Sequence, residues 1–173
     1  MYHFINNRSL TINKMFHLAD PFHVLEIGGG TGDPEPCTST LFWCKTANVV
    51  YSINENPDMT QLIQKTCKKN NFHNLQAKTV SVADWAKSHY GPIDILYMDA
   101  WGPDVDGYQD KYVEAYELVK EKLGNKSVIL VDDTPKLSAR GRGIYLIEAA
   151  RHDGWIIVRQ DHQVLLARRA NRH

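Results

Sequence analysis

Glycine and acidic residues that could hold a cofactor are concentrated between Val24 and Asp33, in the segment VLEIGGGTGD. The apolar residues at its start and the abrupt change to glycine predict a buried strand that passes into a tight loop. Glycine allows positive φ angles and lets a ligand approach the backbone without meeting a Cβ atom. Asp33 stands where the G-x-G-x-x-G dinucleotide fingerprint needs its third glycine, and the sequence has no G-x-x-x-x-G-K-[ST] phosphate loop.

Polar side chains that could bind a ligand accompany the carboxyl ends of five apolar runs, which we interpret as strands. Parallel strands end at one edge of a sheet, and ligands of open α/β sheets bind at that edge, so these side chains are predicted to share one site. A single polar residue at a strand end usually does no more than contact water, but a series of carboxylates on one rim favours a binding site. The series comprises Glu26, Asn54 or Glu55, Asp84, Asp99 and the pair Asp132 and Asp133.

The elements that would position these residues alternate between strand and helix patterns, which predicts a parallel sheet with helices on both faces. The last two β-rich runs flank a short turn and predict a hairpin. The fold class is therefore α/β, a doubly wound, mostly parallel seven-stranded sheet with an antiparallel C-terminal hairpin. The predicted strands lie before Gly28 and at 48–53, 76–82, 93–98, 127–131, 155–159 and 163–168, and the main predicted helices cover 38–43, 57–69, 108–123 and 143–152.

Length and composition predict a single domain over residues 1–173, in which residues 1–20 form a short N-terminal docking segment. Lysine plus arginine equal aspartate plus glutamate, 20 against 20, so the net charge gives no reason to expect a nucleic-acid or membrane partner. No apolar run approaches the ~18 residues of a membrane span, and residues 1–20 lack a signal-peptide core. Cys37, Cys44 and Cys67 lack metal-ligand spacing and are expected to be reduced thiols of a cytoplasmic protein.

The glycine loop resembles the first motif of the class I S-adenosylmethionine-dependent methyltransferases, E-x-G-x-G-x-G. The matching places hold Glu26, Gly28, Gly30 and Gly32. The resemblance implies a Rossmann-like methyltransferase fold with S-adenosylmethionine as cofactor. It places the methionine part of the cofactor along the loop, Thr31 included, and gives the acid the task of fixing that loop.

The same resemblance assigns the ribose and the adenine. An acid after the second strand should bind the ribose hydroxyls, but the matching place in VYSINENPD holds Asn54, and Glu55 follows it. An amide can hydrogen-bond a diol without the charge-assisted strength of a carboxylate, so either residue is a candidate. Asp84 and Trp85 match the third motif, where the acid accepts from the adenine amino group and the next residue borders the ring. Asp84 could instead cap the helix that begins there.

Two acidic motifs further along are similar to those of the metal-dependent O-methyltransferases of the catechol and caffeoyl-coenzyme A type. They are Asp99-Ala-Trp101 and Val131-Asp-Asp-Thr134. The resemblance implies that Asp99, Asp132 and Asp133 bind one Mg²⁺, with Asp99 also near the cofactor and acting in catalysis. Carboxylate oxygens suit Mg²⁺, which would lower the pKa of an acceptor hydroxyl beside the methyl group. The predicted activity is metal-assisted O-methylation of a small hydroxylated acceptor; without the ion, one carboxyl group would have to be protonated or turn to other donors.

Two features depart from that subfamily. Its lysine, three residues after the first metal-binding aspartate, is replaced by Gly102, and Lys111 lies too far along the sequence to take its place by spacing. Residues 1–20 stand where those enzymes have a long helical segment before motif I. The acceptor site is therefore predicted to be open, or completed by a second subunit of a homo-oligomer. The segment Asp33 to Pro36 has the character of a short insertion without an assigned role.

Two other functions are compatible with the sequence. Asn54, Gly102 and the short N-terminal segment also fit a methyltransferase-like fold that serves as an interaction module without activity. An open acceptor site would admit a protein or an RNA, and late arginines could form a basic patch for RNA. Arginines in such positions more often lie on a solvated face, so nucleic acid is not the expected partner. The arginines concerned are Arg140, Arg142, Arg159, Arg168, Arg169 and Arg172.

Overall fold

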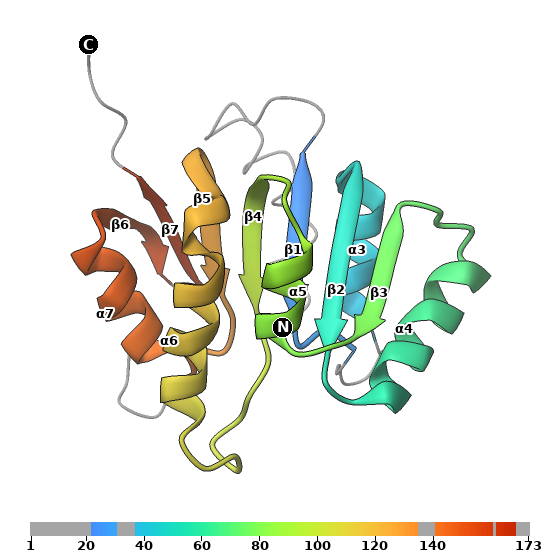
Figure 1. The fold of residues 1–173 in the computed structure, drawn as a ribbon, viewed down its shortest axis with the longest axis horizontal. Helices are drawn as coiled ribbons and strands as arrows, with labels where there is room; N and C mark the ends of the chain where they lie inside the picture. The colour runs from blue at the N-terminus through green and yellow to red at the C-terminus, as the bar shows by residue number, and fades with distance from the viewer. Residues whose placement is uncertain (1–21, 31–36, 135–140, 161, 169–173) are drawn as a thin grey trace.

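The computed structural model describes residues 22–30, 37–134, 141–160 and 162–168 (Figure 1). The predictions for residues 1–20, for Thr31, Gly32 and the Asp33–Pro36 loop, and for Arg140, Arg169 and Arg172 lie outside these ranges. Within them, no helix is long and apolar enough to cross a membrane.

A seven-stranded sheet forms the centre of the protein, with strand order β3-β2-β1-β4-β5-β7-β6. β1 to β5 pair in parallel, whereas β7 runs antiparallel to both β5 and β6. The prediction of a doubly wound, mostly parallel sheet with a closing antiparallel hairpin is confirmed. The strands are β1 (His23–Ile27), β2 (Val49–Asn54), β3 (Leu75–Thr79), β4 (Ile93–Met98), β5 (Leu123–Val131), β6 (Trp155–Gln160) and β7 (Val164–Arg168).

Helices bury both faces of the sheet, as the apolar strands require. Successive strand residues point to opposite faces. Leu25 of β1 therefore packs in the cluster that holds α5 (Val82–Ser88), α6 (Tyr108–Val119) and α7 (Ile144–His152), and Val24 packs in the cluster that holds α3 (Thr38–Thr46) and Cys67 of α4 (Pro57–Lys69). Figure 1 shows α5, α6 and α7 in front of the sheet and α3 behind it.

Two predicted elements have different bounds in the structure. The third strand ends at Thr79, and Ser81 caps α5 by accepting from the Asp84 amide at 3.1 Å, so Val80 and Ser81 connect the strand to the helix that begins at Val82. The helix predicted over 108–123 ends at Val119, followed by a 3₁₀ turn (Lys120–Lys122), and the buried Leu123 begins β5. An apolar residue at a helical interval can belong to the next strand, and periodicity alone cannot separate the two.

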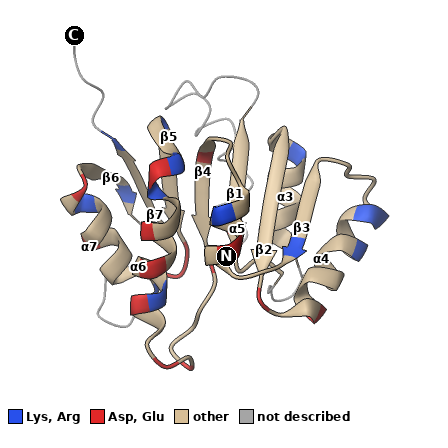
Figure 2. Cartoon of the chain, viewed as in Figure 1, with Lys and Arg blue, Asp and Glu red and all other residues tan. Residues whose placement is uncertain are grey.

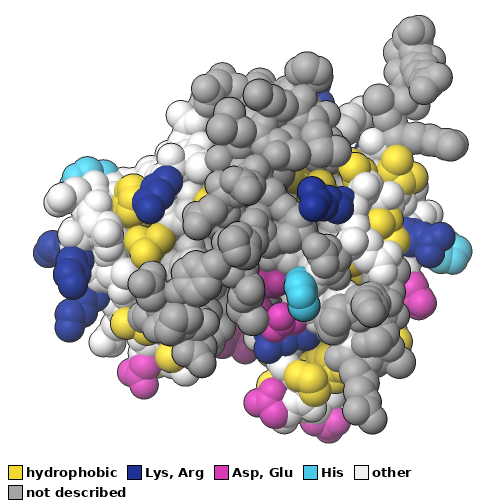
Figure 3. Space-filling model, turned by 180° about the vertical axis from the view of Figure 1, so that it is seen from behind, with side chains coloured by type: hydrophobic (Ala, Val, Ile, Leu, Met, Phe, Trp, Pro, Cys, Tyr) yellow, Lys and Arg dark blue, Asp and Glu magenta, His cyan; other side chains and the backbone are white. Residues whose placement is uncertain are grey.

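Charged side chains of both signs are spread over the helices (Figure 2). Acidic residues lie along the lower edge in that view, which is the edge where the parallel strands end. The view from behind also shows acidic side chains along the lower part of the molecule, some of them beside basic ones (Figure 3). Acidic side chains therefore gather at the edge where the polar rim is predicted, although Glu26 is buried and Asp84 lies in α5.

Candidate active site

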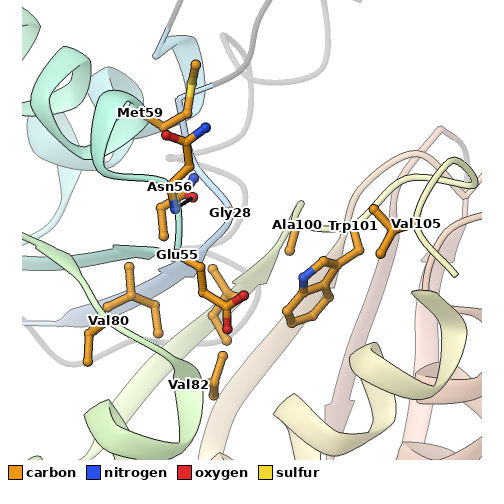
Figure 4. Close-up of a pocket in the computed structure, with 12 residues that line it drawn as sticks. Gly28, Glu55, Asn56, Met59, Val80, Val82, Ala100, Trp101 and Val105 are labelled. Carbon is orange, nitrogen blue, oxygen red and sulfur yellow. Dashed lines mark hydrogen bonds between the residues drawn. The ribbon is translucent and has the colours of Figure 1, made fainter. Parts of the chain in front are cut away.

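A cavity of about 330 Å³ opens at the carboxyl ends of β1, β2 and β4, where the strand order reverses. This switch point is the usual ligand site of an open α/β sheet. The cavity is lined by Gly28 after β1, Asn54 and Glu55 at the end of β2, Val80 after β3, and Ala100 and Trp101 after β4. Figure 4 shows these segments facing one another across the open space.

The glycine loop follows β1 with a backbone that side chains would obstruct. Gly28 has φ 89°, and a Cβ atom there would lie 2.2 Å from the Cα of Ala100. Glycine is therefore required for the ends of β1 and β4 to approach this closely. Gly30 has φ 109°, and its Cβ would meet Ile63 at 3.2 Å. Gly28 lines the cavity, whereas Gly29 and Gly30 are buried behind it, and the role of the loop in holding a cofactor stays a prediction.

Glu26 lies at 0% exposure in β1 and holds the loop from beneath. Its carboxylate accepts hydrogen bonds from Ser39 at 2.7 Å, Thr40 at 2.6 Å and Ser52 at 2.7 Å, which join β1 to α3 and β2. Burial raises the pKa of Glu26, and the three hydroxyl donors oppose that rise. A Cβ atom on Gly29 would lie 2.3 Å from the same carboxylate. Glu26 therefore shapes the loop from behind and does not line the cavity.

Asn54 and Glu55, the two candidates for the ribose, have different surroundings. The Asn54 side chain donates to the Gly29 carbonyl at 3.0 Å and accepts from the Asn56 amide at 2.9 Å. Both polar atoms of the Asn54 side-chain amide thus form hydrogen bonds with backbone groups. Glu55 is exposed, and Figure 4 shows its carboxylate directed into the cavity on the side facing Trp101. The geometry leaves Glu55 as the residue with a free hydrogen-bonding group at this place.

Asp84 and Trp85 do not lie where the resemblance placed them. The Asp84 carboxylate accepts from Ser81 Oγ at 2.8 Å and lies 3.6 Å from the Lys87 ammonium, so it completes the N-terminal cap of α5. Trp85 is 2% exposed and stacks on His89 in the core. Neither residue lines the cavity; Val80 and Val82 do. The helical periodicity that buries Trp85 carries Asp84 onto the solvent face, so neither side chain faces the cavity, and an adenine contact by either residue stays a prediction.

The three aspartates predicted to bind Mg²⁺ are held by other protein groups. Asp99 accepts from Arg142 Nη1 at 2.9 Å, and Asp133 lies 3.4 Å from Arg142 Nη2. Asp132 accepts from the Tyr97 hydroxyl at 2.5 Å and from the Asp133 amide at 2.9 Å. Burial and Asp132 raise the pKa of Asp99 well above its usual range, with Arg142 opposing the rise. Burial disfavours the Arg142 cation, but Asp99 and Asp133 outweigh that effect and raise its pKa.

Solved structures with this architecture are known. Rv0187 from MTB, crystallised with its cofactor, superposes with a TM-score of 0.69 at 17% identity over 94% of this chain and 78% of that one. The SAH-bound methyltransferase PaMTH1 of Podospora anserina gives 0.62 at 16% identity over 92% and 78%. An rRNA methylase of Streptococcus thermophilus gives 0.59 at 10% identity over 92% and 94%. No family model and no curated protein matches the sequence.

The chain has the fold of the class I S-adenosylmethionine-dependent methyltransferases. At these identities the likeness concerns the fold and not the acceptor. In this methyltransferase fold, the cavity of the present chain lies over the carboxyl ends of β1 and β2, beside the glycine loop.

The described residues do not fit the predicted metal site. No group of three or more His, Cys, Asp and Glu side chains among them is placed to hold a metal ion. The physical reason is that the Arg142 guanidinium lies against both Asp99 and Asp133, and Tyr97 holds Asp132. Mg²⁺ demands near-octahedral oxygen ligands, and these carboxylates are turned to donors instead. The arrangement therefore corresponds to the alternative in which the acids find other donors.

Sequence reasoning missed several residues of the site. Val80, Val82 and Met59 line the cavity, but apolar residues beside strand ends carry no signal that separates them from core. The sequence indicates Arg142 only as part of an RNA patch, because 43 residues separate it from Asp99. Lys111, excluded by spacing, has its Nζ atom 5.9 Å from the ring centroid of Trp101, since the first turn of α6 returns to the cavity wall.

Proposed function

We propose that this protein is an S-adenosylmethionine-dependent methyltransferase that methylates a hydroxyl group of a small acceptor. The observation that carries the proposal is the cavity at the switch point, bounded by the half-buried backbone of Gly28 and by the Glu55 carboxylate. The glycine backbone lets a ligand approach closely, and the Glu55 carboxylate is an anionic hydrogen-bond acceptor that points into the cavity. The cofactor would supply an electrophilic methyl group.

Three groups of described residues would bind the three parts of the cofactor. The backbone from Gly28 to Gly30 would hold the methionine part, because glycine lets that part approach closely. Glu55 would accept hydrogen bonds from the ribose hydroxyls, which are charge-assisted and therefore stronger than those of an amide. Val80 and Val82 would pack against the adenine, in the place that the sequence resemblance gives to Asp84 and Trp85.

Asp99 is the group best placed to act on the acceptor. It directly follows β4, and Ala100 and Trp101, the next two residues, line the cavity. Its pKa is raised by burial, which makes its carboxylate a stronger base than an exposed aspartate. Asp99 would accept the proton of the acceptor hydroxyl, with the Trp101 ring forming the wall against which a small apolar acceptor packs.

Calorimetry with S-adenosylmethionine tests the proposal on three forms of the chain. The wild type should bind at one site, and Gly30→Val should weaken binding by on the order of tenfold or more, because the new side chain occupies the loop next to Ile63. Gly154→Ala is the matched control: Gly154 also has a positive φ of 88°, but a Cβ atom there meets nothing within 4 Å. It should bind like the wild type.

Circular dichroism must show that Gly30→Val is folded for the comparison to count. If the folded wild type binds no S-adenosylmethionine, the alternative of a methyltransferase-like interaction module takes the place of this proposal. A protein of that kind should give no methylated product with small phenols and none with RNA. If the cofactor binds and only RNA is methylated, the acceptor class proposed here is wrong.

A further inference from the structure

We propose that the guanidinium of Arg142 is the resident cation of the acidic cluster formed by Asp99, Asp132 and Asp133, in the place that the sequence resemblance gives to Mg²⁺. Its two terminal nitrogens reach two different carboxylates, Nη1 to Asp99 at 2.9 Å and Nη2 to Asp133 at 3.4 Å. A planar guanidinium presents its donors in a fixed fork, which suits it to joining two carboxylates at once.

The backbone around Arg142 holds the side chain in this position. The Arg142 amide donates to the Asp133 carbonyl at 2.9 Å, and Gln109 donates to the Gly141 carbonyl at 2.6 Å. Gly143 has φ 65°, and a Cβ atom there would lie 2.6 Å from Val131 Cγ1, so only glycine lets the chain pass this close to the end of β5. Arg142 is therefore anchored on both sides before its side chain enters the cluster.

The charge balance of the cluster also depends on Arg142. Asp99 has a side chain only 13% exposed, and Asp132 raises its pKa further by repulsion. A buried carboxylate needs a cation or a proton, and Arg142 is the cation that the described residues provide at contact distance. Tyr97 supplies a neutral donor to Asp132 and no charge.

Gly102 makes room for this arrangement. The position is buried, and a Cβ atom there would lie 3.7 Å from Arg142 Nη2 and 2.5 Å from Asp104 Oδ1. A side chain at 102 would thus enter the space beside the guanidinium. Arg142 is thus a permanent cation beside Asp99, and the neighbouring position 102, where the resemblance expects a lysine, holds no side chain.

The presence of a guanidinium in place of a metal ion has a chemical consequence, which rests on the proposed function. A guanidinium keeps its protons at any pH of interest and cannot acidify a bound hydroxyl by coordination. Arg142 is therefore a positioning residue that orients Asp99, and proton acceptance is left to Asp99 itself. Methyl transfer should not depend on a divalent ion.

Manganese binding, followed by electron paramagnetic resonance of Mn²⁺ without S-adenosylmethionine, tests the inference independently of the methyltransferase proposal. The wild type should show no stoichiometric Mn²⁺ site. Arg142→Gln should bind one Mn²⁺ at least about tenfold more tightly than the wild type, since Asp99 and Asp133 lose their cation and become free to turn toward the ion. Adding Asp99→Asn to that variant should abolish the gain, and Arg151→Gln, an exposed arginine of α7, should behave like the wild type.

Three results would overturn the inference. One is a wild-type Mn²⁺ site that Asp132→Asn removes, which would show that the acids bind a metal in the presence of Arg142. Another is a folded Arg142→Gln that gains no Mn²⁺ affinity. If Arg142→Gln does not fold, Arg142→Lys serves in its place. The lysine ammonium group is also a cation, so this variant should have no Mn²⁺ site. A Mn²⁺ site in Arg142→Lys is the third result that would contradict the inference.

Discussion

The side-chain amide of Asn54 donates to the Gly29 carbonyl at 3.0 Å and so ties the end of β2 to the glycine loop that follows β1. Its carbonyl oxygen accepts from the Asn56 amide at 2.9 Å. With both polar ends engaged, Asn54 shapes the loop, and the neighbouring Glu55 is left to face the cavity.

Replacing Asn54 with aspartate should weaken binding of S-adenosylmethionine, because a carboxylate has no donor for the Gly29 carbonyl and would repel it. Glu55→Gln should also weaken binding, by roughly tenfold, through loss of charge-assisted hydrogen bonds to the ribose. Glu114→Gln, an exposed glutamate of α6, is the control. Calorimetry decides: tighter binding by Asn54→Asp would instead make residue 54 the ribose ligand.

Substituting Trp101 and Trp85 should separate the cavity wall from the core. Trp85→Ala should lower the free energy of unfolding by about 3–5 kcal/mol, because the side chain is 2% exposed and stacked on His89. Trp101→Ala should reduce stability much less and should impair methyl transfer, since its ring lines the cavity. Urea unfolding and an initial-rate assay measure the two effects. A folded, fully active Trp101→Ala would remove Trp101 from the acceptor site.

Gly28→Ala should prevent stable folding and should not merely weaken the cofactor site. The added methyl group would lie 2.2 Å from the backbone of Ala100, and positive φ adds further strain. Thermal unfolding measures this directly, with Gly154→Ala as the variant that shares the φ strain but has open space around it. A stable Gly28→Ala would show that β1 and β4 separate easily at this end.

The stability of Glu26→Gln relative to the wild type should rise with pH. Burial raises the pKa of Glu26 in the folded state above its ordinary 4.5, so the folded state binds this proton more tightly than the unfolded state. The resulting stabilisation is complete below pH 4.5 and is lost as pH rises through the raised pKa. Glutamine has no such titration. Urea unfolding of both forms from pH 4.5 to 8 checks the sign; a difference that falls with pH would mean that the three hydroxyl donors outweigh burial.

The alternation of apolar residues made the sheet predictable. Leu25 and Val24 point to opposite faces, as do Leu96 and Ile95, and runs that are apolar on both faces belong to buried parallel strands. The glycine loop was also predictable, because Gly28 and Gly30 adopt φ angles that other residues avoid. The polar rim followed from the strand ends, since all parallel strands end at one edge.

Side-chain direction within the rim was not predictable. Asn54 and Glu55 are adjacent, and which of them faces the cavity depends on the loop to which Asn54 binds. Asp84 fits a cofactor motif by spacing, but the cap of α5 fixes it toward Ser81. Arg142 enters the acid cluster through contacts between segments far apart in the sequence, and no local pattern indicates such a pair. Motif order thus predicted the edge of the sheet at which the cavity lies better than the side chains that line the cavity.

A crystal structure grown with S-adenosylhomocysteine tests the central claim most directly. We expect density for the methionine part along Gly28 to Gly30, the ribose hydroxyls within hydrogen-bond distance of the Glu55 carboxylate, and the adenine against Val80 and Val82. Density at another place, or a cavity that stays empty at saturating ligand concentration, would contradict the assignment of this cavity to S-adenosylmethionine.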